Sequence, residues 1–175
     1  WLEYLDSIYL LHDLWRRGFC FDFVSDKQIE TINIDGQSMV GIGSNYQALV
    51  VPSCRFMPLE TLLRLLSFQK QGVPVLFVSP GPTDVPGYSR LETRRKEFNE
   101  LIREVSVCDD LEWELENVGI NRESLTDFRG MQFIRRSHDD GHYYFLVNQG
   151  EDMIDEWINL EVDFETAFIM DPMSG

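Results

Sequence analysis

The stretch RRSHDDGHYY, residues 135–144, is the densest group of catalytic and metal-binding residue types in the chain. Two histidines flank two aspartates and a glycine, so the stretch could hold a metal ion or supply a general acid and base. A catalytic zinc site needs three protein ligands, and Asp-Asp-Gly is also typical of a turn, where aspartates hydrogen-bond their own backbone. We therefore interpret the stretch as the turn of a β hairpin.

The length of the hairpin loop decides whether the two histidines can cooperate. With a two-residue loop at 140–141, His138 and His142 point to opposite faces of the hairpin. With a three-residue loop at 139–141, they lie opposite each other on one face. The sequence leaves both loops open, and in neither case does a third ligand have a defined spacing. We predict no metal site here.

Cys54 follows a predicted strand, which is where nucleophile elbows lie. Such an elbow normally needs small residues, usually glycines, on both sides of the nucleophile. Here the neighbours are Ser53 and Arg55, so we predict no catalytic role for Cys54. An amidotransferase-like hydrolase that uses this thiol is kept as an alternative.

The loop SPGPTDVPGYS, residues 79–89, follows another predicted strand. Ligands of open α/β sheets bind at that end of the strands. The glycines do not match a nucleotide-binding motif, and three prolines remove N–H donors. Neighbouring acidic residues elsewhere resemble turns and solvated faces, not a glycosidase acid pair. We assign no catalytic, cofactor-binding or metal-binding residue and predict no cofactor. The residues expected at a ligand or interface edge are Ser25, Asp26, Cys54, Arg55, Ser79 and Gly81.

These positions depend on an alternation of helices and strands in the first part of the chain. The apolar spacing and end signals predict helices over 1–17, 58–72, 90–105 and 109–119, and strands over 19–25, 46–52 and 73–79. Such an order is typical of an α/β fold with a flavodoxin-like parallel sheet and flanking helices. A first strand upstream of Trp1 is left open. Shorter signals are a hairpin at Asp35-Gly36 and capping boxes at Ser25/Gln28 and Ser89/Glu92.

The helical period stops after the last of these helices. Short strand-like runs follow at 131–136, 142–148, 155–162 and 166–172, which indicates antiparallel β structure. We expect two domains, 1–128 and 129–175, the second being an antiparallel β segment that begins a sandwich or adds to a sheet. This segment is too small to form a full sandwich, so it must pair with the first part, another chain or missing sequence.

Composition narrows the classes of partner. Lys and Arg number 15 against 30 Asp and Glu, a net charge of −15, so we expect neither nucleic acid nor an anionic membrane as a partner. No apolar run reaches the roughly 20 residues of a membrane helix, and no signal peptide is present. The chain has no initiator Met and begins inside a helical pattern, which suggests a piece of a longer protein. The three cysteines have neither zinc spacing nor the spacing of a disulfide framework.

Several stretches in one order resemble the late portion of α-L-rhamnosidase-type glycoside hydrolases of family 106. In that family FIHRR, YFVSN and LWDPxTG motifs follow a flavodoxin-like domain and lead into a β-sandwich. The matching stretches here are FIRR at 133–136, YFLVN at 144–148 and DPMSG at 171–175, after the series at 1–29, 34–52 and 57–78. The resemblance covers nearly the whole chain. One departure is Met170, where the family usually has an aromatic residue.

The resemblance implies a non-catalytic accessory fragment of a secreted or periplasmic carbohydrate-active hydrolase. In that family the catalytic carboxylates and metal site lie in an upstream barrel, so no catalytic residue is carried over to this chain. The implied partners are the barrel of the same polypeptide and the carbohydrate substrate of the parent protein. The alternative is a flavodoxin-like module that binds a small anionic ligand or flavin.

Overall fold

The computed structural model describes the backbone of residues 2–36, 38–41 and 44–174, and the side chains of these residues except 2–7, 41 and 44. Contacts divide the chain into two compact units. The first unit holds the residues up to His12 together with Asp22–Ile120, and the second holds Asp13–Phe21 together with the residues from Asn121. Residues 121–128 thus group with the later part of the chain, on the other side of the boundary expected at 128/129.

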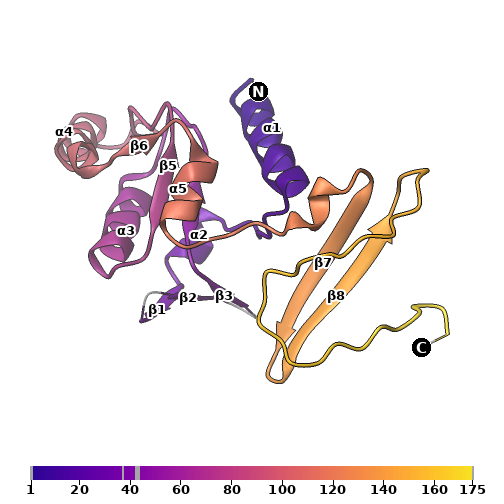
Figure 1. The fold of residues 1–175 in the computed structure, drawn as a ribbon. Helices are drawn as coiled ribbons and strands as arrows, with labels where there is room; N and C mark the ends of the chain where they lie inside the picture. Colours follow the sequence, from indigo (N-terminus) through magenta and orange to yellow (C-terminus); the bar gives the residue numbers. More distant parts are fainter. Residues whose placement is uncertain (1, 37, 42–43, 175) are drawn as a thin grey trace. The chain divides into compact units, whose positions relative to one another are not determined.

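A three-stranded parallel sheet with helices on both faces organises the first unit (Figure 1). Its strands are β4 (Leu49–Val51), β5 (Val75–Val78) and β6 (Val107–Cys108), in the order β4-β5-β6. Its helices are α3 (Leu59–Lys70), α4 (Leu91–Leu101), which ends in the 3-10 turn η1 (Ile102–Glu104), and α5 (Leu111–Asn117). The α/β class with helices around a parallel sheet is confirmed; β6 is a strand that the sequence analysis missed.

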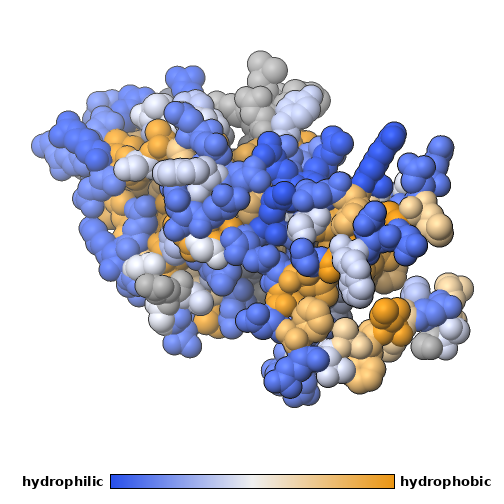
Figure 2. Space-filling model, in the orientation of Figure 1, coloured by the Kyte–Doolittle hydropathy of each residue, from blue (hydrophilic) through white to orange (hydrophobic). Residues whose placement is uncertain are grey.

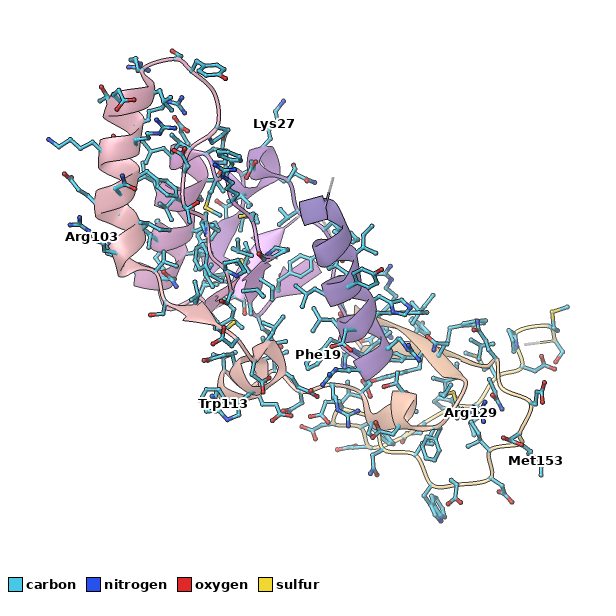
Figure 3. All side chains as sticks on the ribbon, turned by 90° about the horizontal axis from the view of Figure 1, so that it is seen from above. Phe19, Lys27, Arg103, Trp113, Arg129 and Met153 are labelled. Carbon is cyan, nitrogen blue, oxygen red and sulfur yellow. The ribbon has the colours of Figure 1, made fainter. Side chains whose placement is uncertain are left out.

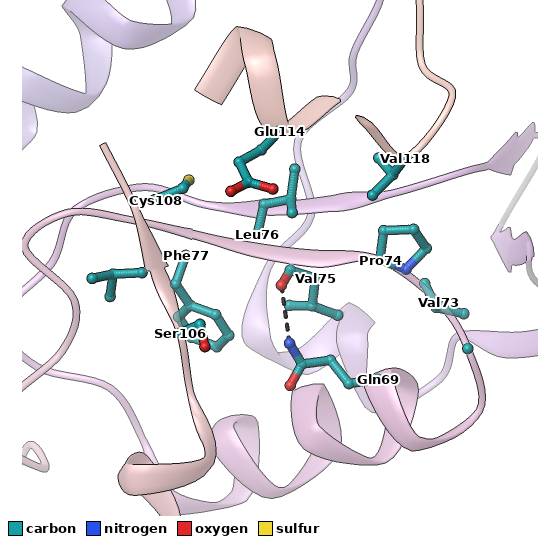
Figure 4. A pocket seen from close by; sticks show the side chains of 12 residues that line it. Gln69, Val73, Pro74, Val75, Leu76, Phe77, Ser106, Cys108, Glu114 and Val118 are labelled. Carbon is teal, nitrogen blue, oxygen red and sulfur yellow. Dashed lines mark hydrogen bonds between the residues drawn. The ribbon is translucent and has the colours of Figure 1, made fainter. Parts of the chain in front are cut away.

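The core of the first unit lies between the sheet and α3. Val75 and Phe77 alternate along β5 with less buried residues, because successive side chains of a strand point to opposite faces. The buried face meets the apolar stripe of α3, and Phe98 of α4 joins the same cluster. Helix α5 covers the other face of β5 (Figure 4). The helices and the sheet therefore bury one another's apolar sides.

A second sheet of the first unit is an antiparallel meander. It contains β1 (Asn33–Asp35), β2 (Ser38–Gly41) and β3 (Ser44–Tyr46). The predicted hairpin is confirmed, with Asp35 paired to Ser38 and Gly36 at φ +62° in the turn. The strand predicted over 46–52 is confirmed as β4, Leu49–Val51, but it is shorter than expected, because Tyr46 ends β3 of this meander instead.

Helices α1 (Leu2–Arg17) and α2 (Asp26–Ile29) begin the fold. Gly18, at φ +96°, ends α1 as predicted, and the Ser25/Gln28 capping box of α2 is confirmed in both directions. The strand predicted over 19–25 is wrong: this segment crosses from the second unit to the first and joins no strand ladder in the described chain. Its residues favour an extended backbone, but a strand forms only when that backbone pairs with a neighbouring strand.

The capping box predicted at Ser89/Glu92 is also wrong. The residue that precedes α4 is Arg90, in a left-handed conformation at φ 47°, and no side chain caps this end of the helix. The carbonyl of Ser89 instead accepts a hydrogen bond from Nε of Arg94, at 2.8 Å.

The second unit is built around a β hairpin. Strands β7 (Met131–His138) and β8 (Gly141–Asn148) follow the 3-10 turn η2 (Ser124–Asp127). The antiparallel strands predicted at 131–136 and 142–148 are confirmed. The runs 155–162 and 166–172 form no strand in the structure. Their apolar residues stay largely exposed, and Figure 2 shows this orange surface along the hairpin and the C-terminal segment.

The hairpin loop consists of Asp139 and Asp140. His138 pairs with Gly141, and Ser137 pairs with His142. The loop therefore has two residues, and it lies one residue earlier than the two-residue loop expected at 140–141. Cross-strand partners share a face, so the two histidines lie on opposite faces.

No described helix is both long enough and apolar enough to cross a bilayer. Charged side chains extend outward from the first unit, such as Lys27 on α2 and Arg103 on η1 (Figure 3).

Candidate functional site

Two loops at the carboxyl end of the parallel sheet run side by side, one after β4 and one after β5. The carbonyl of Arg55 accepts hydrogen bonds from the N–H groups of Thr83 and Asp84, at 3.0 and 3.1 Å. The N–H of Met57 donates to the carbonyl of Asp84 at 3.0 Å. Phe56 and Asp84 form a parallel bridge. The loops thus prolong the pairing of β4 and β5 beyond the sheet.

Four of the expected edge residues lie in these two loops. Cys54 is partly buried against the core, and the guanidinium of Arg55 lies 4.9 Å from the centre of the Phe56 ring. The N–H of Ser79 donates to the carbonyl of Cys108 at 2.9 Å. A Cβ atom added to Gly81 would lie 2.7 Å from Cγ1 of Val107, so a larger residue here would require the Val107 side chain to shift. These contacts connect the loops to the sheet; binding of a ligand here stays a prediction.

The other two expected residues, Ser25 and Asp26, stabilise α2. The Ser25 hydroxyl accepts from the N–H of Gln28 at 3.3 Å. Oδ1 of Asp26 accepts from the hydroxyl of Thr61 at 3.0 Å, which connects α2 to α3. Both side chains therefore have a local structural role.

Two arginines of α4 brace the loop that follows β5. Arg94 donates to the carbonyls of Pro86, Gly87 and Ser89, at 2.7, 2.8 and 2.8 Å. Arg95 forms a two-pronged ion pair with Asp84, at 2.8 and 2.7 Å. The hydrogen bond from Arg95, and then that from the N–H of Val85, lower the pKa of Asp84 to about 2. The loop is thus held in one conformation by charge-assisted hydrogen bonds.

A shallow cavity of about 370 Å³ lies beside β5, between α3 and α5 (Figure 4). Its walls are largely apolar, and Nε2 of Gln69 is bound to the carbonyl of Val75 at 3.1 Å. Glu114 is the one carboxylate among the described lining residues. Burial, and then the charge of Glu114, raise the pKa of the Cys108 thiol. A single carboxylate beside a protonated thiol provides neither an acid pair nor an activated nucleophile.

The most completely buried charged group in the described chain is Glu123 of the second unit, 1% exposed. Its Oε1 accepts hydrogen bonds from Nη1 of Arg135 at 2.7 Å and from the hydroxyl of Tyr144 at 2.6 Å. Its Oε2 accepts from the N–H of Glu161 at 3.0 Å. Burial, and then the hydrogen bond to Glu123, raise the pKa of Tyr144 to about 12. We call these four residues the Glu123 cluster.

The Glu123 cluster joins three segments that are far apart in the sequence: the turn before the hairpin, the hairpin itself and the irregular C-terminal segment. Each member of the cluster is hydrogen-bonded to another member, so the cluster presents no free nucleophile or base. Sequence reasoning missed Glu123, because nothing local distinguishes it from the many other acidic residues. Arg135 and Tyr144, by contrast, are the first and last residues of the stretch RRSHDDGHYY that had been singled out.

Metal ligands do not converge in the described chain, where no three His, Cys, Asp or Glu side chains form a group able to hold a metal ion. His138 stacks on Tyr143, with ring centres 4.5 Å apart, and its Nδ1 accepts from the N–H of Asp140 at 3.2 Å. The interpretation of RRSHDDGHYY as a hairpin turn is confirmed. The three cysteines, all in the described chain, form no disulfide.

Comparison with known proteins finds one informative similarity. The chain is 21% identical over 180 aligned residues to a protein of Formosa agariphila named "Putative beta-glucuronidase". The alignment covers 97% of this chain and 15% of that protein, so the chain spans less than a sixth of its relative. No protein-family model matches the chain. No solved structure matches it either.

Proposed function

We propose that the chain is a non-catalytic accessory region of a larger carbohydrate-active hydrolase. The observation that carries the proposal is the alignment to 15% of a protein named as a β-glucuronidase, which takes in 97% of this chain. The chain corresponds to a minor part of that relative. The chemistry of a glycosidase would then belong to the other parts of the polypeptide, and the rhamnosidase-type motifs specify the finer class that we propose.

The side chains of the described residues favour an accessory role over a catalytic one. Glycoside hydrolysis uses two carboxyl groups about 5 to 9.5 Å apart across a cleft that admits the sugar. In this chain Glu123 is enclosed by its own hydrogen-bond partners, and Asp84 is held by Arg95. The cavity beside β5 contributes only Glu114. Glu123 and Asp84 therefore have structural partners, and Glu114 has no second carboxylate beside it in the cavity.

The second unit has a surface suited to a protein partner. One face of the hairpin carries exposed apolar side chains of β7 and β8, namely Ile134, Tyr143, Phe145 and Val147. The segment after β8 adds exposed side chains such as Trp157 and Ile169. A two-stranded hairpin is marginally stable alone, and large exposed apolar patches mark interaction sites. We propose that these side chains pack against the catalytic barrel or a further sheet of the same polypeptide. We also propose that this polypeptide is exported to the periplasm or outside the cell.

Activity assays on two forms of the protein test the proposal. The full product of the gene should release 4-nitrophenol from an aryl β-D-glucuronide or an aryl α-L-rhamnoside, while the isolated chain should release none. In the full product, Phe145→Asp should lower the temperature at which activity is lost, because it puts a charge into the proposed interface. Hydrolysis by the isolated chain, or a gene without a catalytic domain, would show the proposal to be wrong.

A further inference from the structure

We propose that the tip of the loop between β5 and α4 is a binding site for an acidic sugar, with Tyr88 as the platform for the ring and Arg90 as the partner of the carboxylate. The inference deepens the proposed function and rests on it for the class of ligand. Its structural basis is the combination of two exposed side chains with a loop that is rigidly braced.

Tyr88 is 93% exposed and lies at the tip of this loop. Most tyrosines bury the ring and expose only the hydroxyl, because the ring is the apolar part. Here both parts meet solvent, and within the described chain neither the ring nor the hydroxyl has a partner. An exposed aromatic ring on a surface loop is suited to pack against the apolar face of a pyranose, whose axial C–H groups form a flat patch.

Arg90 supplies a cation two residues further on. Its side chain is exposed, and its guanidinium has no hydrogen-bond or ion-pair partner among the described residues. Two residues span at most about 7 Å of chain, which is within the dimensions of one monosaccharide unit. A guanidinium binds a carboxylate through two parallel N–H donors. The pair therefore fits a uronate better than a neutral sugar.

The backbone conformation of Arg90 supports a role beyond the fold. Its φ of 47° and ψ of 37° are left-handed, a conformation that is costly for a residue with a Cβ atom. Among the described residues it is the one non-glycine residue with positive φ. Glycine would occupy this position with less strain, so the cost of arginine is consistent with selection for its side chain.

The loop that carries Tyr88 and Arg90 is already ordered. Arg94 holds three of its carbonyls, and Arg95 holds Asp84. The side chain of Val85, 2% exposed, anchors the middle of the loop in the core. Because the loop is fixed beforehand, ligand binding does not have to order the backbone. The two bracing arginines make their assigned hydrogen bonds within the protein, whereas the exposed side chain of Arg90 makes none among the described residues.

Titration of the isolated chain with two oligosaccharides tests the proposal. The probes are a β-linked oligoglucuronate of four units and cellotetraose, its neutral counterpart, followed by NMR shifts of backbone amides. We expect shifts confined to residues 86–91 and tighter binding of the glucuronate, with a preference that falls as salt is raised. Tyr88→Ala should weaken binding of both sugars about fivefold. Tyr9→Ala, at a tyrosine that is 70% exposed in α1, is the matched control and should leave binding unchanged.

Substitution of Arg90 gives a result that a purely structural role would not. Arg90→Gly should raise the melting temperature by about 2–4 °C through relief of strain, and should remove the preference for the glucuronate. Equal binding of the two sugars by the natural chain, wild-type affinity in Tyr88→Ala, or no binding at millimolar sugar would each overturn the inference. Hydrolysis by the full gene product tests the proposed function separately. If the chain binds uronate but the full gene product contains no hydrolase, the proposed function is contradicted and the binding site is not.

Discussion

Replacing Glu123 by alanine should destabilise the second unit by about 3 kcal/mol. The substitution removes the acceptor of three hydrogen bonds, which come from Arg135, Tyr144 and the N–H of Glu161. Loss of one partner from a buried ion pair typically costs about 3–5 kcal/mol, because the remaining charge stays desolvated. The Arg135 side chain is 26% exposed and can turn partly to water, so we expect the lower end of that range.

Graded variants should separate the contributions within the Glu123 cluster. Glu123→Gln keeps the shape but presents an amide N–H₂ to groups that are all donors, and should cost about 2 kcal/mol. Tyr144→Phe removes one donor and leaves the ion pair, and should cost about 1 kcal/mol. Asp127→Asn is the control, since its ion pair with Arg122 is equally short, at 2.7 Å, but the aspartate is 57% exposed. It should cost less than about 1 kcal/mol.

Native-state hydrogen exchange measures these effects unit by unit. In Glu123→Ala the slowest amides of β7 and β8 should exchange about 100-fold faster, which corresponds to about 3 kcal/mol. The amides of α3 and β5 should keep their rates, because they belong to the first unit. Equal losses in Glu123→Ala and Asp127→Asn, or unchanged protection of the hairpin, would refute the view that a buried carboxylate holds this unit together.

Three further predictions concern Asp84, Tyr144 and Gly18. The pKa of Asp84 is about 2 in the folded chain and 3.8 ordinarily. The ion pair of ionised Asp84 with Arg95 therefore stabilises the fold above pH 4, and this stabilisation is lost as pH falls through 2. The melting temperatures of wild type and Asp84→Asn should converge below pH 2. One tyrosine should ionise near pH 12 by absorbance at 295 nm, and Tyr144→Phe should abolish that transition. The protonated hydroxyl of Tyr144 therefore stabilises the fold below pH 10, and this contribution is lost as pH rises through 12. Gly18→Ala should cost about 2–3 kcal/mol in urea unfolding, because φ is +96° and the new Cβ would overlap the carbonyl oxygen of Glu123.

Local signals in the sequence predicted the elements that depend on neighbouring residues. The apolar stripe of α3, the glycine at the end of α1 and the Ser25/Gln28 capping box all involve contacts within a few residues, and each is present. The hairpin of β7 and β8 was predicted for the same reason, because turn residues and alternating strands are neighbours in sequence. Its loop was misplaced by one residue, since Asp139-Asp140 and Asp140-Gly141 carry nearly the same turn signal.

Elements that depend on distant partners were predicted less well. The segment 19–25 has the composition of a strand but meets no strand in the described chain, and Val107–Cys108 becomes one because β5 offers an edge. Ser89 and Glu92 have the spacing of a capping box, yet Arg94 occupies the Ser89 carbonyl and Arg90 takes the position before the helix. In each case a contact from another element overrides the local preference.

The sequence by itself determined the class of the fold, the identity of RRSHDDGHYY as a turn and the acidic character of the chain, because periodicity, turn chemistry and charge are properties of short stretches. Only the tertiary structure decided which carboxylates have a hydrogen-bond or ion-pair partner. Glu123 and Asp84 look like other acidic residues until Arg135, Tyr144 and Arg95 are brought to them from elsewhere in the chain. Such pairs form when packing closes long loops, and no local pattern records which residues will meet.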